Sequence, residues 1–489
     1  MIKTISTKKT KKKVGHVVSY FSGVAKITGL TGVFLHELIM NERKNPVAIV
    51  IGFAKDLVEV LFFSENTPLD KPLFRSQKTF SININDQIVG RVLDGLGEAR
   101  DGLGKLKGTA YEIFKQAPPI IARKAVNRPL STGIKIIDAA LSLGRGQREL
   151  IIGDQKLGKT TLVQDIVLNQ KHAKTPVICI YVSCGQKKQK MLDMTALFEN
   201  NSAFLYTTVI ATTAEDSYAS QYLAPFVGCA IGEYFRDQGQ DALIIYDDLS
   251  KHAKIYRSIS LLLERSPGRE AYPGDIFSIH AGLLERAAQM SDKNGGGSLT
   301  ALPIIETQEG DITSFIPTNI ISITDGQIYL ESGLLQKGFL PAVNVGLSVS
   351  RLGSQVQPAI LKEVVGGIRL SLSQHKELQK LTQLETVVSD IAQKKIHRGD
   401  LTLQLLTQEK HSNVSWPAQV ILFYLVEEGF FDDMGTDKWS EFEKMLLDLL
   451  NNKYSDVLDK IEQGIFDKKI KIKLQKILSD FKEEFMIEK

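Results

Sequence analysis

The first eighty residues carry short apolar segments that are separated by glycines. Four of these segments are rich in valine, isoleucine and phenylalanine, and they span Val14–Tyr20, Val24–Ile27, Val47–Phe53 and Leu57–Phe63. Several short strands with turn residues between them are typical of a small β-barrel. We therefore predict an N-terminal β-barrel over residues 1–79, preceded by a short basic tail.

Residues 80–357 follow a different pattern, in which continuous apolar runs alternate with stretches of helical spacing. The apolar runs are Glu149–Ile152, Val177–Val182, Phe204–Ile210, Ala242–Tyr246 and Ile320–Ile323. Such runs are typical of strands that are buried on both faces, as in a parallel sheet flanked by helices. This region is predicted to be an α/β domain.

Residues 358–489 contain fewer glycines, and helical spacing dominates. One example is the set Leu458, Ile461 and Ile465, and another is the pair Ile470 and Leu474. This spacing predicts a C-terminal α-helical domain. A multidomain fold also agrees with the length of 489 residues, which is too long for one compact core.

The charge of the chain is nearly balanced, with a net charge of +4 from 60 basic and 56 acidic side chains. Nucleic-acid-binding domains concentrate positive charge, so no nucleic-acid partner is expected. The basic run Lys8–Lys13 is predicted to be a solvated tail, with a contact to anionic lipid or to an acidic partner as the alternative. Three cysteines without metal-ligand spacing indicate a reducing compartment. No apolar run is long enough to span a bilayer, so we expect any membrane association to be peripheral or through partners.

The strongest local signal is a loop rich in glycine and lysine between the apolar strand Leu150–Ile152 and the helical stretch Leu162–Gln170. The loop and the residue after it read Gly153, Asp154, Gln155, Lys156, Leu157, Gly158, Lys159, Thr160 and Thr161. Glycines let backbone amides turn toward phosphate, and the N-terminus of the following helix adds a positive dipole. The loop is therefore predicted to bind the phosphates of a nucleoside triphosphate or diphosphate, such as ATP or ADP.

Two oxygen-bearing side chains are predicted to hold Mg²⁺ beside this loop. The hydroxyl of Thr160 would ligate the ion, while Lys159 would reach the terminal phosphates. Asp247 stands at the end of the apolar strand Ala242–Tyr246 and would hold the ion through a water molecule. Solvated strand-end carboxylates are the alternative, which the upstream phosphate loop disfavours.

Longer segments of the chain carry a more specific signal, and they are Gly144–Leu150, Leu243–Lys251, Pro267–Asp275, Leu284–Met290, Gly295–Pro303, Ile316–Gln327 and Pro341–Arg351. Together they resemble the alpha subunit of F-type rotary ATPases. The family consists of a β-barrel, a RecA-like nucleotide-binding domain and a helical domain, which agrees with the three regions above. The resemblance implies a catalytic beta partner in an alternating hexameric ring and a central, gamma-like shaft. It also implies a cytoplasmic location, peripheral on the inner face of a bacterial membrane through partner subunits.

Two positions favour the alpha subunit over the catalytic one. Catalytic subunits carry a glutamate where this chain has Gln186, and a glutamine cannot act as a base toward the attacking water. The chain's own site is therefore predicted to bind nucleotide and to hydrolyse it poorly. The resemblance also implies that Arg351, which follows Ser348 and Ser350, reaches the terminal phosphate in the partner's catalytic site. An arginine suits this role because it is always charged and contacts two oxygens at once.

The sequence departs from the family around the predicted nucleotide. Residues 155–157 replace an Arg-Gln-Thr sequence, Leu335 replaces an aromatic residue, Leu340 an arginine and Lys410 a glutamine. Gln408, which contacts nucleotide in the family, is retained. The affinity and base preference of the site stay open at this stage.

Three alternatives also stay open. The segment before the barrel lacks the family's usual helical extension, which is compatible with a divergent F-type-like ATPase that drives another machine, such as gliding motility in wall-less bacteria. A self-sufficient export ATPase or helicase is disfavoured by Gln186. A scaffold without nucleotide chemistry is disfavoured by Lys159, Thr160 and Asp247.

Overall fold

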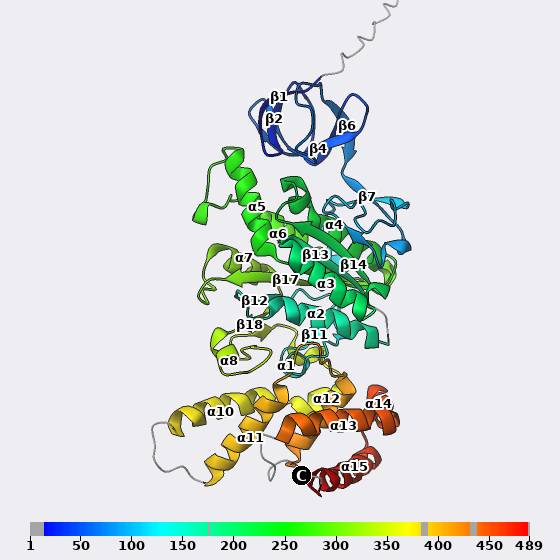
Figure 1. The fold of residues 1–489 in the computed structure, drawn as a ribbon, viewed down its shortest axis with the longest axis vertical. Helices are drawn as coiled ribbons and strands as arrows, with labels where there is room; N and C mark the ends of the chain where they lie inside the picture. The colour runs from blue at the N-terminus through cyan, green and yellow to red at the C-terminus, as the bar shows by residue number, and fades with distance from the viewer. Residues whose placement is uncertain (1–13, 175–176, 383–389, 431–437, 488–489) are drawn as a thin grey trace, which may run out of the picture.

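The computed structural model describes residues 14–174, 177–382, 390–430 and 438–487. A β-barrel, an α/β domain and a group of helices follow one another along the long axis of the molecule (Figure 1). The predicted multidomain fold is confirmed. The lysine-rich run before residue 14 lies outside the described residues.

The N-terminal barrel consists of six antiparallel strands in the order β1-β2-β5-β4-β3-β6. A bridge between Gly15 and Leu73 joins its two edges, and its core includes Ile27, Val50 and Val60. Strand β6 is largely polar, so the pattern of apolar runs did not predict it. The strands are β1 (His16–Phe21), β2 (Val24–Thr28), β3 (Glu37–Met40), β4 (Pro46–Ala54), β5 (Leu57–Phe62) and β6 (Phe74–Thr79).

The α/β domain is built on a nine-stranded sheet whose main path runs β19-β18-β12-β17-β15-β13-β14-β8. Its strands are parallel, except that β19 pairs antiparallel with β18 at one edge and β16 pairs antiparallel with β17. The strands are β8 (Val92–Leu93), β12 (Leu150–Asp154), β13 (Val177–Gln186), β14 (Thr207–Thr213), β15 (Asp241–Asp247), β16 (Ala288–Gln289), β17 (Ser298–Thr307), β18 (Gly326–Leu330) and β19 (Val349–Ser350).

Helices cover both faces of this sheet, as the continuous apolar runs predicted (Figure 1). Neighbouring residues of one strand enter different cores: Ile151 packs in the same cluster as α2 and α3, and Ile152 packs in the cluster of α4 and α5. The helices of the domain are α1 (Lys135–Ala140), α2 (Lys159–Asn169), α3 (Lys188–Asn200), α4 (Tyr218–Asp237), α5 (Leu249–Leu262), α6 (Ile276–Leu284), α7 (Phe315–Ile323) and α8 (Ser332–Gln336).

One predicted strand is wrong. The run Ile320–Ile323 is the end of helix α7, whose buried residues Ile316, Ile320 and Ile323 recur at helical spacing. The sheet instead gains β17, which lies between β12 and β15. Threonines and Pro303 interrupt the apolar run of β17, so its sequence did not stand out.

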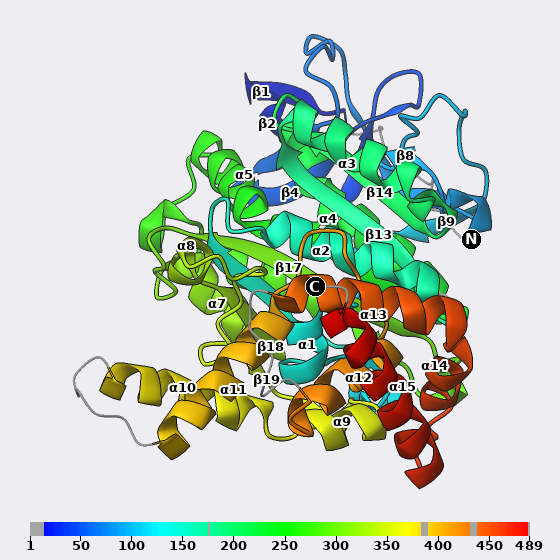
Figure 2. The same cartoon turned by 60° about the horizontal axis from the view of Figure 1, so that its bottom comes forward.

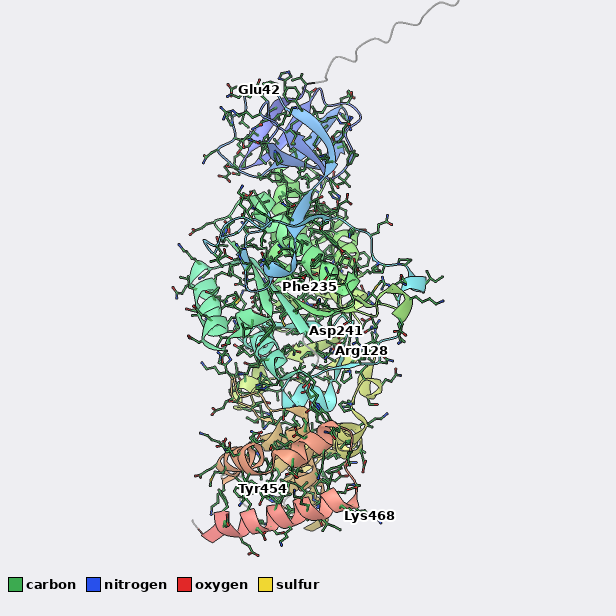
Figure 3. All side chains as sticks on the ribbon, turned by 90° about the vertical axis from the view of Figure 1, so that its right-hand side faces the viewer. Glu42, Arg128, Phe235, Asp241, Tyr454 and Lys468 are labelled. Carbon is green, nitrogen blue, oxygen red and sulfur yellow. The ribbon has the colours of Figure 1, made fainter. Side chains whose placement is uncertain are left out.

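Short two-stranded sheets connect the larger parts of the chain. Strand β7 (Ser81–Ile84) pairs with β9 (Thr109–Glu112) beside the barrel, and β10 (Pro129–Leu130) pairs with β11 (Leu143–Gly144). Arg128, which precedes β10, forms an ion pair with Asp241 at the start of β15. Both residues are labelled near the middle of the molecule in Figure 3.

The C-terminal helices pack around the buried helix α12, which is surrounded by α9, α11, α13 and α14 (Figure 2). A buried ion pair between Lys135 of α1 and Glu443 of α13 ties these helices to the α/β domain. Among the described residues, no helix is both long and apolar enough to cross a membrane. The helices are α9 (Ala359–Val365), α10 (Ile368–Thr382), α11 (Asp390–Leu406), α12 (Trp416–Glu427), α13 (Trp439–Lys453), α14 (Ser455–Glu462) and α15 (Lys468–Ile487).

Candidate functional site

The glycine- and lysine-rich loop lies between strand β12 and helix α2, as predicted. Gly158 precedes the first turn of α2 with a φ of +92°, a conformation that glycine adopts without strain. Asp154 anchors the other end of the loop, because its Oδ1 accepts hydrogen bonds from Thr307 Oγ1 at 2.6 Å and from the amide of Gly310 at 2.8 Å. The loop is therefore a turn of fixed shape that leads into a helix N-terminus, which is the arrangement that binds phosphate.

Lys159 is the first residue of α2, and its side chain folds back over the loop. Its Nζ donates hydrogen bonds to the carbonyl oxygens of Gly153 at 2.8 Å and of Asp154 at 2.5 Å. Burial lowers the pKa of this ammonium group, while the nearby carboxylates of Glu306 and Asp248 oppose that shift. A buried cation held only by carbonyl oxygens is well placed to bind an incoming phosphate.

Thr160 and Asp247 face each other across the site. The Thr160 hydroxyl donates a hydrogen bond of 3.0 Å to Asp247 Oδ2, which also accepts one of 2.6 Å from the Tyr181 hydroxyl. Paired oxygen donors of this kind suit Mg²⁺. Within the described parts of the chain, no cluster of three or more His, Cys, Asp or Glu could hold a metal ion. Magnesium at Thr160 and Asp247 would therefore take most of its ligands from phosphate and water.

Gln186 is buried at the end of strand β13, beside the same carboxylate. Its Nε2 donates a hydrogen bond of 3.0 Å to Asp247 Oδ1. The amide thus contacts the predicted magnesium ligand directly and offers no basic group to a water molecule.

Asp248 caps helix α5 rather than pointing at the loop. Its Oδ1 accepts a hydrogen bond of 2.8 Å from the amide of Lys251, and its Oδ2 lies 2.5 Å from Lys251 Nζ. Burial raises the pKa of Asp248 to about 6, and the ion pair with Lys251 opposes this shift.

The remaining loop residues have separate surroundings. Gln155 Nε2 donates a hydrogen bond of 3.1 Å to Glu306 Oε2 at the end of β17. Lys156, Leu157, Gly158 and Thr161 line a pocket of about 440 Å³ beside the loop.

That pocket lies between the phosphate loop, the segment after α8 and the segment after α11. Its apolar walls include Ile134, Leu162, Leu335, Leu340 and Pro341. Asp165, Gln408, Glu409 and Lys410 complete the lining. The structure therefore brings Gln408, which is predicted to contact nucleotide, close to the phosphate loop across a long sequence separation.

Arg351 lies away from the phosphate loop. It follows the antiparallel edge strand β19, whose residue Ser350 pairs with Gly326 at the start of β18. Because β18 is parallel to β12, Arg351 stands at the amino ends of the parallel strands, whereas the phosphate loop stands at their carboxyl ends. The Arg351 side chain is exposed and forms no ion pair with the other described residues.

Ser348 and Ser350 support the chain that leads to Arg351. The buried Ser348 hydroxyl donates a hydrogen bond of 2.7 Å to the Asn344 carbonyl and accepts one of 2.9 Å from the Tyr329 amide. Ser350 Oγ accepts a hydrogen bond of 3.1 Å from the Gly353 amide. Both hydroxyls are thus used within the chain, which favours a positioning role over contact with a ligand.

The sequence pattern did not indicate that Tyr181 or Glu306 belongs to the site. Tyr181 appears in the sequence as one apolar position of a buried strand, and only the pairing of β13 with β15 places it beside Asp247. Glu306 lies on β17, the strand that was not predicted. A carboxylate at the end of an apolar segment was its only sequence signal.

Family models match most of the chain. The nucleotide-binding domain of the ATP synthase alpha/beta family matches residues 133–350, and the C-terminal domain of ATP synthase alpha/beta chains matches residues 357–481.

Curated relatives match over nearly the full length. ATP synthase subunit alpha of Helicobacter pylori strain Shi470 is 47% identical over 474 residues, which is 96% of this chain and 94% of the relative. The Helicobacter acinonychis subunit has the same identity and coverage. The Aquifex aeolicus subunit is 44% identical over 489 residues, covering 99% of this chain and 97% of the relative. These matches confirm the resemblance found in the sequence, and the chain belongs to the ATP synthase alpha/beta family.

Proposed function

We propose that this chain is a nucleotide-binding, non-catalytic subunit of an F-type rotary ATPase, and that it completes the active site of a neighbouring catalytic subunit. The full-length relatives are named ATP synthase subunit alpha. Under this proposal the chain alternates with catalytic beta subunits in a hexameric ring around a central shaft. The ring lies on the cytoplasmic side of a bacterial membrane, which it meets through partner subunits.

The chain's own site binds Mg-ATP or Mg-ADP. Lys159 exchanges the carbonyl oxygens of Gly153 and Asp154 for phosphate oxygens, and the amides at the start of α2 point toward the same phosphates. Thr160 and Asp247 hold the magnesium ion, which neutralises phosphate charge when bound. Gln186 orients Asp247 but accepts no proton from water, so bound nucleotide persists.

The observation that carries the proposal is the position of Arg351 relative to the phosphate loop. The two lie at opposite ends of the parallel strands, so Arg351 cannot serve the chain's own nucleotide. An exposed guanidinium without an ion-pair partner in the described part of the chain is available to a neighbour. There it stabilises the charge that develops on the transferred phosphoryl group.

Steady-state hydrolysis by the assembled complex tests this role. Arg351→Ala is expected to lower kcat by about 10³ or more, as measured for arginine fingers elsewhere. Arg351→Lys is expected to restore little, because a lysine lacks the planar fork. The matched control is Arg43→Ala, in the exposed turn between β3 and β4 of the barrel. A kcat for Arg351→Ala within a few-fold of the wild type would refute the proposal.

A further inference from the structure

The pocket beside the phosphate loop is where the base of a bound nucleotide would lie, so the following inference rests on the proposed function. Lys156, Gly158 and Thr161 belong to the loop and also line the pocket, which makes the pocket continuous with the phosphate site. Its volume of about 440 Å³ lies in the range of small-ligand pockets. Its polar side chains decide whether it distinguishes one base from another.

Gln408 lines the pocket, but its amide is used within the chain. Its Oε1 accepts a hydrogen bond of 2.9 Å from the amide of Lys135. Its Nε2 donates hydrogen bonds of 2.8 Å to the Gly133 carbonyl and 2.6 Å to the Ser412 carbonyl. Both N–H donors of the amide are therefore occupied, and turning the amide toward a base would break all three bonds. Gln408 joins the helical domain to the start of α1 and leaves no donor for a base.

Asp165 is the buried carboxylate of the pocket, and it is occupied as well. Its Oδ1 accepts hydrogen bonds from His411 Nδ1 at 2.7 Å and from the His411 amide at 3.1 Å. The backbone carbonyl of Asp165 accepts a further bond of 2.7 Å from Asn413. These contacts hold the segment after α11 against α2, so Asp165 also supports the pocket from behind.

The two residues that follow Gln408 at the pocket edge form no such contacts. Glu409 and Lys410 are both exposed, and neither has an ion-pair or hydrogen-bond partner among the described residues. They are adjacent and of opposite charge. A carboxylate accepts from the amino group of adenine or from the N1 and N2 hydrogens of guanine, whereas an ammonium donates to ring nitrogens or to the guanine carbonyl. The same pair can therefore satisfy either purine by a change of rotamer.

The apolar walls of the pocket would contact the base but would not distinguish adenine from guanine. Leu335, Leu340, Pro341 and Leu162 present aliphatic carbons, and these pack on the faces of adenine and guanine alike. Strong discrimination, by factors of about 10⁴ or more, requires fixed polar groups that the wrong ligand leaves unpaired, whereas apolar pockets reach only about 10–200.

We infer that this site binds the magnesium complexes of purine nucleoside triphosphates without selecting between adenine and guanine. The phosphate loop binds the phosphates, the aliphatic pocket accepts the base, and Gln408 is a positioning residue that holds the pocket together. The dissociation constants of Mg-ATP and Mg-GTP at this site are expected to agree within about tenfold.

Equilibrium binding of labelled ATP and GTP to the assembled complex, with magnesium, tests the inference. Binding that disappears when this chain carries Lys159→Ala belongs to its own site, which separates it from the sites of the partner. A preference of more than 100-fold for either nucleotide would overturn the inference while leaving the proposed function intact. The absence of any Lys159-dependent binding would overturn the nucleotide-binding part of the proposed function itself. Inorganic tripolyphosphate is expected to bind more weakly than both, and equal binding would show that the base contributes nothing in this pocket.

Variants of the pocket separate positioning from base recognition. Gln408→Ala is expected to weaken ATP and GTP binding by similar factors, because it loosens the junction with Lys135 and Gly133. If Gln408→Ala weakened ATP binding but not GTP binding, Gln408 would be shown to recognise adenine, and the inference would fail. The double variant Glu409→Ala, Lys410→Ala is expected to keep the ratio of the two affinities within about tenfold. A loss confined to one nucleotide would show instead that these two side chains select the base.

Discussion

The side-chain amide of Gln186 donates a hydrogen bond of 3.0 Å to Oδ1 of Asp247. Oδ2 of the same carboxylate accepts hydrogen bonds from Thr160 and Tyr181. Three uncharged donors thus surround one buried carboxylate. A glutamate at position 186 would place a second carboxylate where one of these donors now stands.

Gln186→Glu is therefore expected to destabilise the magnesium-free chain at about pH 8 by about 1–3 kcal/mol, because a hydrogen bond is lost and two carboxylates face each other. The penalty should shrink toward about pH 5, where the pair takes up a proton. Urea unfolding at both pH values measures the effect. Gln186→Leu removes the hydrogen bond without adding charge, so its penalty should not vary with pH. Identical pH dependence of the two variants would contradict the contact.

Thr160→Val is expected to weaken binding of Mg-ATP at this chain's site by about tenfold or more, since valine keeps the shape of threonine but offers no oxygen to magnesium. Binding of ATP without magnesium should change little. Thr160→Ser, which keeps the hydroxyl, is the matched control. Lys159-dependent nucleotide binding to the assembled complex, with and without magnesium, measures both effects. Equal losses in the two conditions would argue against a magnesium ligand.

The buried ion pair of Lys135 and Glu443 gives a prediction about stability. Glu443→Gln leaves the Lys135 ammonium, whose pKa burial already lowers, without its counter-charge, which is expected to cost about 3–5 kcal/mol. The double variant Lys135→Met, Glu443→Leu removes both charges and is expected to recover most of that loss. Unfolding followed by tryptophan fluorescence reports on this region directly, because Trp439 Nε1 donates a hydrogen bond of 3.0 Å to Glu443. A double variant no more stable than Glu443→Gln would contradict the prediction.

Two buried histidines determine part of the acid sensitivity of the α/β domain. His252 Nε2 lies 3.0 Å from the Tyr222 carbonyl, so it carries the proton, and His252 Nδ1 accepts from His280 Nε2 at 3.1 Å. His280 Nδ1 then has no hydrogen-bond partner. Burial lowers the pKa of His252 from 6.5 to about 4, and burial also holds the pKa of His280 well below its usual value. The unfolded chain therefore binds more protons than the folded chain below about pH 6.5, and stability is lost as the pH falls.

His252→Gln is expected to reduce that loss. Between about pH 7 and about pH 5, the wild-type chain should lose about 2 kcal/mol more of its unfolding free energy than the variant. His16→Gln, at an exposed position of strand β1, is the matched control for removing a histidine from the surface. Urea unfolding across this pH range gives the comparison, and parallel curves for wild type and His252→Gln would exclude a buried neutral histidine.

Local patterns predicted the parts of this molecule that local chemistry determines. The strand, glycine turn and helix of the phosphate loop are adjacent in the sequence, so the loop could be recognised there. The run Ile320–Ile323 misled because a short apolar run fits a strand as well as a buried helix, and β17 was missed because Pro303 and threonines interrupt it.

Contacts between distant residues could not be predicted from such patterns. Tyr181 meets Asp247 only through the register of two paired strands. Gln408 accepts from Lys135 across 273 positions of sequence, and nothing near Gln408 in the chain indicates that its amide is already occupied. The resemblance to a family marks Gln408 as a nucleotide contact, and the folded chain shows that its amide also links the segment after α11 to the start of α1.

Arg351 and the phosphate loop lie at opposite ends of the same parallel strands. The chain therefore presents two different surfaces to its neighbours, one at each end of these strands. An arrangement with twofold symmetry brings identical surfaces together, and would set arginine against arginine or loop against loop. Only head-to-tail contacts set the arginine of one chain against the phosphate-binding edge of the next. Such contacts are heterologous, and they either close into a ring or continue as a filament. Under the proposed function, the strand direction of this sheet determines the order, clockwise or anticlockwise, in which Arg351 and the phosphate loop follow each other around the ring.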